Sequence, residues 1–226
     1  MKKLITICLT AVMILTLAAC GNSASTDSSS DKGTAKEEKD REQASAAKDD
    51  DVLILYFSAA NSADADAVTS ATPLIDGVSS VEWIADIIRD RTGGELVPII
   101  PSESYPTGYD ELADQAEKEE KDNSRPAFED IGVDPSAYST IFIGYPVWWY
   151  TTPMIIQTFF DEYDLSGVTI IPFNTHEGSS DGGTYDLIRE LEPDAEVLEG
   201  IPIRGNDAGS DDAEKEIEQW LKGLGL

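Results

Sequence analysis

Residues 141–150 read IFIGYPVWWY, a short apolar run followed closely by three adjacent aromatic residues. The run Ile141–Ile143 is typical of a strand that is buried on both faces of a sheet. Side chains alternate between the two faces of an extended chain, so one core does not accommodate Trp148, Trp149 and Tyr150 together. We therefore expect part of this aromatic group to contact something other than the protein core.

Strand-like and helix-like segments alternate along the chain from Asp51 onward. The expected strands are residues 51–57, 94–100, 138–146, 167–175 and 195–203, and the expected helices are residues 79–94, 108–121, 152–163 and 210–225. Ser79 and Glu82 have the spacing of a capping box, and Gly93 is placed to end the first helix. This alternation predicts an α/β fold with a doubly wound parallel sheet of five strands and helices on both faces.

Three unusual loops follow strand ends, at residues 58–80, 146–150 and 175–183. In open parallel sheets, ligands bind outside the carboxyl ends of the strands, where the strand order reverses. Because all three loops would lie at that edge, the sequence predicts a ligand pocket there.

Composition excludes several classes of site and partner. The only cysteines are Cys8 and Cys20, and His176 is the single histidine, so we expect no metal or iron–sulfur centre and no disulfide in the domain. Acidic residues number 44 against 16 basic ones, for a net charge of −28. Such a charge disfavours nucleic acid as a partner.

The first twenty residues have the pattern of a secretory signal peptide. Two lysines precede an apolar run that ends in small residues before Cys20, and the run is too short for a membrane span. Residues 17–20 resemble a bacterial lipobox, and the resemblance implies cleavage before Cys20 and lipid attachment to its sulfur. The alternative is an ordinary signal peptide in which the cysteine is incidental.

Residues 21–50 lack apolar periodicity and are rich in Ser, Ala, Lys and acidic residues, which predicts a disordered tether. Residues 51–226 are then a single domain. With a lipid at Cys20, we expect this domain to be extracytoplasmic and anchored to the bacterial cell membrane.

From about Val52 to the C-terminus, the sequence resembles the flavodoxin family, specifically a bacterial branch with a GYPVWW-like segment. The resemblance is carried jointly by YFS, EWIADIIRDRTGGELVPI, YPTGYDEL, GYPVWWYTTP, TIIPFNTHEGSSDGG and PDAEVLEG. It implies strand order 2-1-3-4-5, with flavin mononucleotide (FMN) bound at the switch between the first and third strands. The extra aromatic residues would then stack on the isoalloxazine ring. The alternative, in which all of them belong to the core, stays open at this point.

The same resemblance assigns a phosphate site to the first loop. Ser58 and Asn61 are similar to the start of the usual phosphate loop, and Gly77, Ser79 and Ser80 to its end. The loop contains no Lys or Arg, so backbone amides and hydroxyls at a helix N-terminus would have to hold the phosphate.

Residues 64–74 look like an insertion in that loop. They contain DAVTSAT, residues 66–72, which resembles the motif at which an extracytoplasmic flavin transferase attaches FMN to the final threonine through a phosphoester. The resemblance implies covalent attachment at Thr72. Pro73 and Leu74 depart from the residues that often follow the motif, and a chance match is the alternative.

Two further loops would contact the flavin under this resemblance. They contribute Pro146, Val147, Trp148, Trp149, Tyr150, Thr175, His176, Gly178, Ser179 and Gly183. His176 is the one candidate catalytic residue: it could transfer a proton, donate a hydrogen bond to the flavin or a substrate, or only orient its loop. Glu177 is expected to be solvated.

The function expected from these features is extracytoplasmic electron transfer by a membrane-anchored FMN protein. Its partners would be a redox protein or a small-molecule electron acceptor, together with a flavin transferase. One alternative is an FMN-dependent reductase of quinones or other small molecules. Another is a surface binding lipoprotein whose flavin site has decayed.

Overall fold

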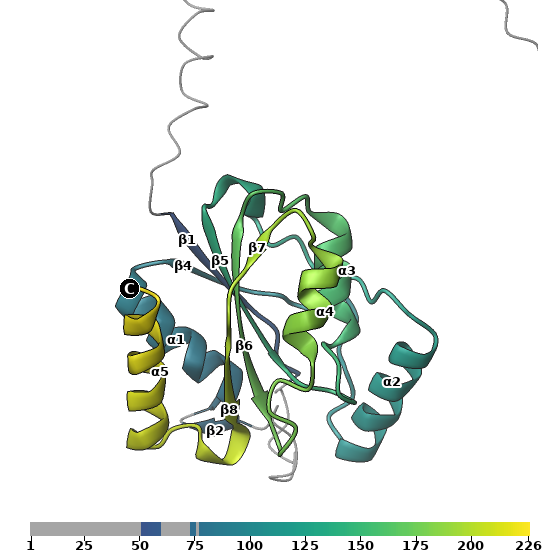
Figure 1. Ribbon diagram of the computed structural model, residues 1–226. Helices are drawn as coiled ribbons and strands as arrows, with labels where there is room; N and C mark the ends of the chain where they lie inside the picture. The colour runs from purple at the N-terminus through teal and green to yellow at the C-terminus, as the bar shows by residue number, and fades with distance from the viewer. Residues whose placement is uncertain (1–50, 60–72, 76) are drawn as a thin grey trace, which may run out of the picture. The chain divides into compact units, whose positions relative to one another are not determined.

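The computed structural model describes residues 51–59, 73–75 and 77–226, which lie in one unit of the chain, Ala46–Leu226. Its main sheet is parallel throughout and has the order β4-β1-β5-β6-β7, with β8 also paired to β6 (Figure 1). The strands are β1 (Val52–Tyr56), β4 (Glu95–Pro98), β5 (Thr140–Pro146), β6 (Thr169–His176), β7 (Glu196–Val197) and β8 (Ile201–Arg204). Since β7 and β8 share the fifth position, the predicted α/β fold and the order 2-1-3-4-5 are confirmed.

Helices cover both faces of this sheet. In Figure 1, α1 (Ser80–Thr92) and α5 (Asp211–Gly223) lie on one side, and α3 (Met154–Glu162) and α4 (Thr184–Leu191) lie on the other. The helix α2 (Tyr109–Lys121) lies beyond α3, farther from the sheet. The first helix begins and ends as expected: the Ser79 hydroxyl accepts from the Glu82 N–H, and Gly93 takes a left-handed conformation. None of the helices in the described ranges combines the length and apolarity needed to cross a membrane.

Successive residues of the central strands place their side chains in two separate apolar clusters, one on each face of the sheet. Leu53 and Leu55 pack with the α3 and α4 side, whereas Ile54 packs with the α1 and α5 side, and all three are completely buried. The strand β1 is therefore apolar at every position, as a strand covered on both faces requires.

The fifth strand is interrupted, contrary to the continuous strand expected over residues 195–203. Val197 pairs with Ile170 but Ile201 pairs with Phe173, so one additional residue is accommodated opposite Pro172. At Gly200 a Cβ atom would lie 2.2 Å from the Pro172 carbonyl oxygen, so the backbone passes too close there for a side chain. The extra residue and the close approach at Gly200 both lie between β7 and β8.

The structure also contains elements that the sequence reading missed. The helix α4 buries Tyr185 and Ile188, which are three residues apart on one helical face. In the first loop, β2 (Pro73–Ile75) and β3 (Val78–Ser79) form a short antiparallel pair. Two 3₁₀ turns, η1 (Pro135–Ala137) and η2 (Gly205–Asp207), complete the described elements.

The close packing of β5 on β6 yields a stability prediction at Gly144. A Cβ atom at this position would lie 2.2 Å from the ring of Phe173, which is completely buried. We expect Gly144→Ala to lower the free energy of unfolding by about 1–3 kcal/mol, because the ring must shift in a packed core. Urea unfolding checks this value. Gly223→Ala is the control, since no atom lies within 4 Å of that Cβ; equal losses for the two variants would contradict the prediction.

Candidate active site

The aromatic segment after β5 forms a tight two-residue turn. Trp148 and Thr151 exchange two backbone hydrogen bonds, of 3.1 and 2.9 Å, across Trp149 and Tyr150. The two central residues have φ angles of 49° and 62°, in the left-handed region. Turns of this geometry favour Asn and Gly, and other residues cost about 1–2 kcal/mol each there. The structure therefore holds Trp149 and Tyr150 in a strained conformation.

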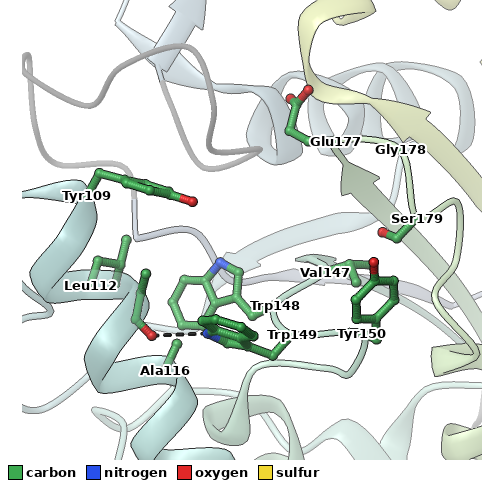
Figure 2. Close-up of a pocket in the computed structure, with 11 residues that line it drawn as sticks. Tyr109, Leu112, Ala116, Val147, Trp148, Trp149, Tyr150, Glu177, Gly178 and Ser179 are labelled. Atoms are coloured by element: carbon green, nitrogen blue, oxygen red, sulfur yellow. Dashed lines mark hydrogen bonds between the residues drawn. The ribbon is translucent and has the colours of Figure 1, made fainter.

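This turn separates the three aromatic side chains (Figure 2). Trp148 meets the rings of Phe57 and Tyr105 edge to face, with centroids 5.4 Å away in each case, and so joins the core. Trp149 is 51% exposed, and its indole N–H donates to the Ala113 carbonyl of α2 at 3.0 Å. Tyr150 is 76% exposed. Only the first of the three aromatics is a core residue, and the other two keep free ring surface.

A glycine-rich loop after β6 lies against the same turn. His176 Nδ1 accepts from the Gly178 N–H at 2.9 Å, and Asp181 accepts from the Gly183 N–H at 3.0 Å. At Gly182, a Cβ atom would lie 3.0 Å from the Val147 side chain and 3.5 Å from the Tyr150 Cα. The two loops can approach this closely because Gly182 has no side chain.

Buried polar side chains beneath the loop fix its position. Asn174 is completely buried; its amide donates to the Ser180 carbonyl at 3.1 Å and accepts from the Tyr185 hydroxyl at 2.6 Å. The Tyr145 hydroxyl donates to Thr184 at 2.9 Å. A satisfied buried network of this kind rigidifies the segment that it holds. Sequence reasoning missed these residues, because their partners lie on different elements.

The two loops and α2 enclose a cavity of about 470 Å³ at the carboxyl edge of the sheet. This volume lies in the range of small-molecule and cofactor sites. The lining residues are Tyr109, Leu112, Ala113, Ala116, Val147, Trp148, Trp149, Tyr150, Glu177, Gly178 and Ser179. Six of them were predicted from the two loops; the α2 residues and Glu177 were not.

Four other predicted residues support the cavity without lining it. Pro146 and Thr175 are buried and pair at the end of β5 and β6, and the Val147 N–H donates to the Thr175 carbonyl at 2.9 Å. His176 uses Nδ1 to hold Gly178, which is the orienting role among its alternatives. Gly183 is the residue before α4.

The predicted phosphate residues are only partly described. Ser58 follows β1, Ser80 is the first residue of α1, and Ser79 uses its hydroxyl oxygen to cap that helix. Because α1 connects two parallel strands, its N-terminus lies at the edge where β1 ends. Gly77 is exposed, with a φ angle of 92°.

Asn61, Thr72 and Cys20 lie outside the described residues. The structure therefore does not test the roles predicted for these three positions.

The expectation that Glu177 is solvated is wrong. Its side chain is 21% exposed, and its Oε1 is buried without a hydrogen-bond partner among the residues that the structure describes. No local sequence pattern indicates this burial, because the other carboxylate oxygen is held by Arg204, at the end of β8, and Asn206, in η2.

These features define a ligand site of the kind found in open parallel α/β sheets. The family model described as flavodoxin matches residues 76–223, and the chain belongs to the flavodoxin family. No curated protein matches the chain.

Several solved structures are similar to this chain. A proposed flavoprotein of Bacteroides eggerthii is 28% identical, with a TM-score of 0.61, and the match covers 78% of this chain and 98% of that one. A second proposed flavoprotein, from Bacteroides uniformis, is 26% identical with a TM-score of 0.60, over 76% and 97% of the two chains. A flavoprotein of Lactobacillus acidophilus in complex with FMN shares the fold at 20% identity and a TM-score of 0.55, over 74% and 97%.

The role of His176 in its loop predicts a pH-dependent stability. Burial, and next the Arg204 guanidinium, lower the pKa of His176 below its ordinary 6.5. Below pH 6.5 the unfolded chain therefore binds a proton that the folded chain resists, so the folded state loses stability as the pH falls. His176→Asn supplies an acceptor for the Gly178 N–H that does not titrate.

We expect the difference in unfolding free energy between the parent protein and His176→Asn to be constant above about pH 7. As the pH falls toward 5, the parent should lose stability relative to the variant, by less than about 1.4 kcal/mol per pH unit, the limit for one proton. Chemical unfolding at several pH values measures this difference. A difference that does not change with pH would refute the role of His176.

Proposed function

We propose that this protein binds FMN in the cavity between the 148–151 turn and the 177–183 loop and transfers electrons through it. The observation that carries the proposal is the strained turn, which presents two exposed aromatic rings at the edge of a cofactor-sized cavity. Membership of the flavodoxin family and the FMN complex of the Lactobacillus acidophilus relative support FMN as the cofactor.

The residues of the cavity fit a flavin. Trp149 and Tyr150 offer ring faces for stacking, and the Gly178–Gly183 backbone can approach a polar ring edge closely because its glycines have no side chains. At the same edge of the sheet, the N-terminus of α1 can attract an anionic phosphate through the helix dipole and its first-turn backbone.

Bound FMN would supply the redox chemistry. The residues of this chain would then bind the ring, orient it and exclude water from the stacked face. Trp148 would support the turn from below through its contacts with Phe57 and Tyr105. His176 would hold the 177–183 loop in place.

A specific observation favours a second candidate function, reduction of a quinone or another small molecule. The cavity has a largely apolar far wall, formed by Tyr109, Leu112 and Ala116 of α2, which could contact a flat substrate. A decayed flavin site is a weaker hypothesis, since strained residues persist where they serve a function and these two line the cavity that would hold the flavin.

We also propose that the protein is extracytoplasmic and held at the membrane by lipid on Cys20. The support is the signal-peptide pattern of residues 1–20 and the lipobox-like ending. Its partners would be a redox protein or a small-molecule electron acceptor outside the membrane.

The motif at residues 66–72 supports covalent attachment of FMN to Thr72 by a flavin transferase. A tethered flavin would meet its pocket at high effective concentration, so a phosphate site without Lys or Arg would be sufficient.

The strained turn provides the test of the proposed site. Replacing Trp149 with Asn and Tyr150 with Gly suits the left-handed backbone and removes both rings. In the flavin-free protein we expect the free energy of unfolding to rise by about 1 kcal/mol, because relief of strain exceeds the loss of the Trp149–Ala113 hydrogen bond. FMN affinity should fall at least about ten-fold, because the stacking surface is lost.

Urea unfolding and fluorescence titration with FMN measure the two effects. Asn123→Gly is the matched control, since Asn123 also has a positive φ, of 49°, but lies outside the cavity and its two loops. It should leave FMN affinity unchanged. If the turn variant binds FMN as tightly as the parent protein, the proposed site is wrong.

Covalent attachment has a separate test in Thr72→Val. With the protein exported alongside an active flavin transferase, we expect a fluorescent band that survives denaturation in the parent protein. The band should disappear in Thr72→Val, which keeps the shape of the side chain but has no hydroxyl. Thr107→Val, at an exposed threonine of the domain, should retain it. Denaturant-resistant fluorescence in Thr72→Val would exclude attachment at this residue.

A further inference from the structure

Among the described residues that line the cavity, Glu177 is the one acidic side chain. Its Oε2 accepts from the Asn206 amide at 3.3 Å and lies 3.6 Å from Arg204 Nε. Arg204 ends β8, and Asn206 lies in η2, so both partners belong to one ordered segment. This segment fixes one oxygen of the carboxylate and thereby orients the other.

The other oxygen, Oε1, is buried and has no hydrogen-bond partner in the described part of the chain. Burial raises the pKa of Glu177, and the neighbouring Arg204 offsets part of that effect. A buried acceptor without a donor is costly, and such atoms are rare in folded proteins.

A second buried carboxylate in this fold, that of Glu119, accepts hydrogen bonds at both of its oxygens. Glu119 is 9% exposed, yet Tyr105 donates to its Oε2 at 3.0 Å and Gln115 donates to its Oε1 at 2.8 Å. Glu119 has donors for both oxygens, whereas the described residues supply donors for only one oxygen of Glu177, which borders the cavity. The missing donor of Glu177 is therefore best supplied by the ligand of the cavity.

We infer that Glu177 Oε1 accepts a hydrogen bond from an N–H or hydroxyl of the bound flavin and selects for ligands that carry such a donor. This inference rests on the proposed function. The phosphate end of FMN is anionic and would be repelled by the carboxylate, so the donor is either the ring N3–H or a ribityl hydroxyl. Glu177 is thus a specificity-determining residue of the flavin site.

The test compares Glu177→Ala with Glu199→Ala. Glu199 also pairs with an arginine, Arg189 at 3.3 Å, but it is outside the cavity and its side chain is 82% exposed. In the full-length protein, we expect FMN affinity to fall about ten-fold or more in Glu177→Ala and to stay unchanged in Glu199→Ala. The flavin-free Glu177→Ala protein should be at least as stable as the parent, because a poorly satisfied buried acid is removed.

Two analogues identify the donor. Lumiflavin keeps the ring N3–H but has no ribityl chain, and N3-methyl-lumiflavin has neither donor. If Glu177→Ala weakens FMN and lumiflavin but leaves N3-methyl-lumiflavin unaffected, the donor is the ring N–H. If it weakens FMN and leaves lumiflavin unaffected, the donor is a ribityl hydroxyl. Either result supports the inference.

Two results would overturn it. Equal FMN affinity in Glu177→Ala and Glu199→Ala would show that Oε1 accepts nothing from the ligand. A loss of the same size for all three compounds, including N3-methyl-lumiflavin, would show that the variant damages the cavity generally. If the parent protein itself does not bind FMN, the proposed function is wrong and the inference with it. This outcome differs from failure of the inference alone, in which the parent protein binds FMN and Glu177→Ala binds it equally well.

Discussion

The parallel register between β5 and β6 is the constraint on which the site depends. Seven consecutive pairs, from Thr140 with Thr169 to Pro146 with Thr175, bring the two strands to an end at the same level. The hydrogen bond from the Val147 N–H to the Thr175 carbonyl extends this pairing by one residue into the loops. The aromatic turn and the glycine-rich loop therefore leave the sheet side by side, and a shift of register would separate the walls of the cavity.

Around this register the protein retains features that lower its own stability. Trp149 and Tyr150 occupy left-handed positions that suit Asn and Gly better, and Glu177 buries an oxygen that has no donor among the described residues. Each feature is costly in the free protein, and each lies on the wall of the same cavity. These features lie together for a simple physical reason if a ligand supplies the stacking partner and the missing donor. Binding of that ligand would then offset the loss of folding stability that the features cause.

Much of the fold could be predicted from the sequence, because apolar strands and capped helices depend on local patterns. The run Leu53–Leu55 identifies a central strand, and Ser79 with Glu82 marks the start of α1. The site was less predictable because its decisive contacts join distant elements. Nothing near Trp149 in sequence indicates its bond to Ala113, and nothing near Glu177 indicates that Arg204 and Asn206 hold it. The left-handed turn was also unpredictable, since neither of its central residues is the usual Asn or Gly.

The central claim is that FMN binds against the 148–151 turn, and the indole N–H signals of the protein test it most directly. The chain has four tryptophans, and Trp83 and Trp220 lie on α1 and α5, outside the cavity. In a nuclear magnetic resonance titration of the flavin-free protein with FMN, the signals of Trp148 and Trp149 should shift saturably. The signal of Trp220 should stay in place, and it is the control, since Trp83 lies in the first turns of α1, near the proposed phosphate site. Unmoved signals from Trp148 and Trp149 at saturating FMN would contradict the account.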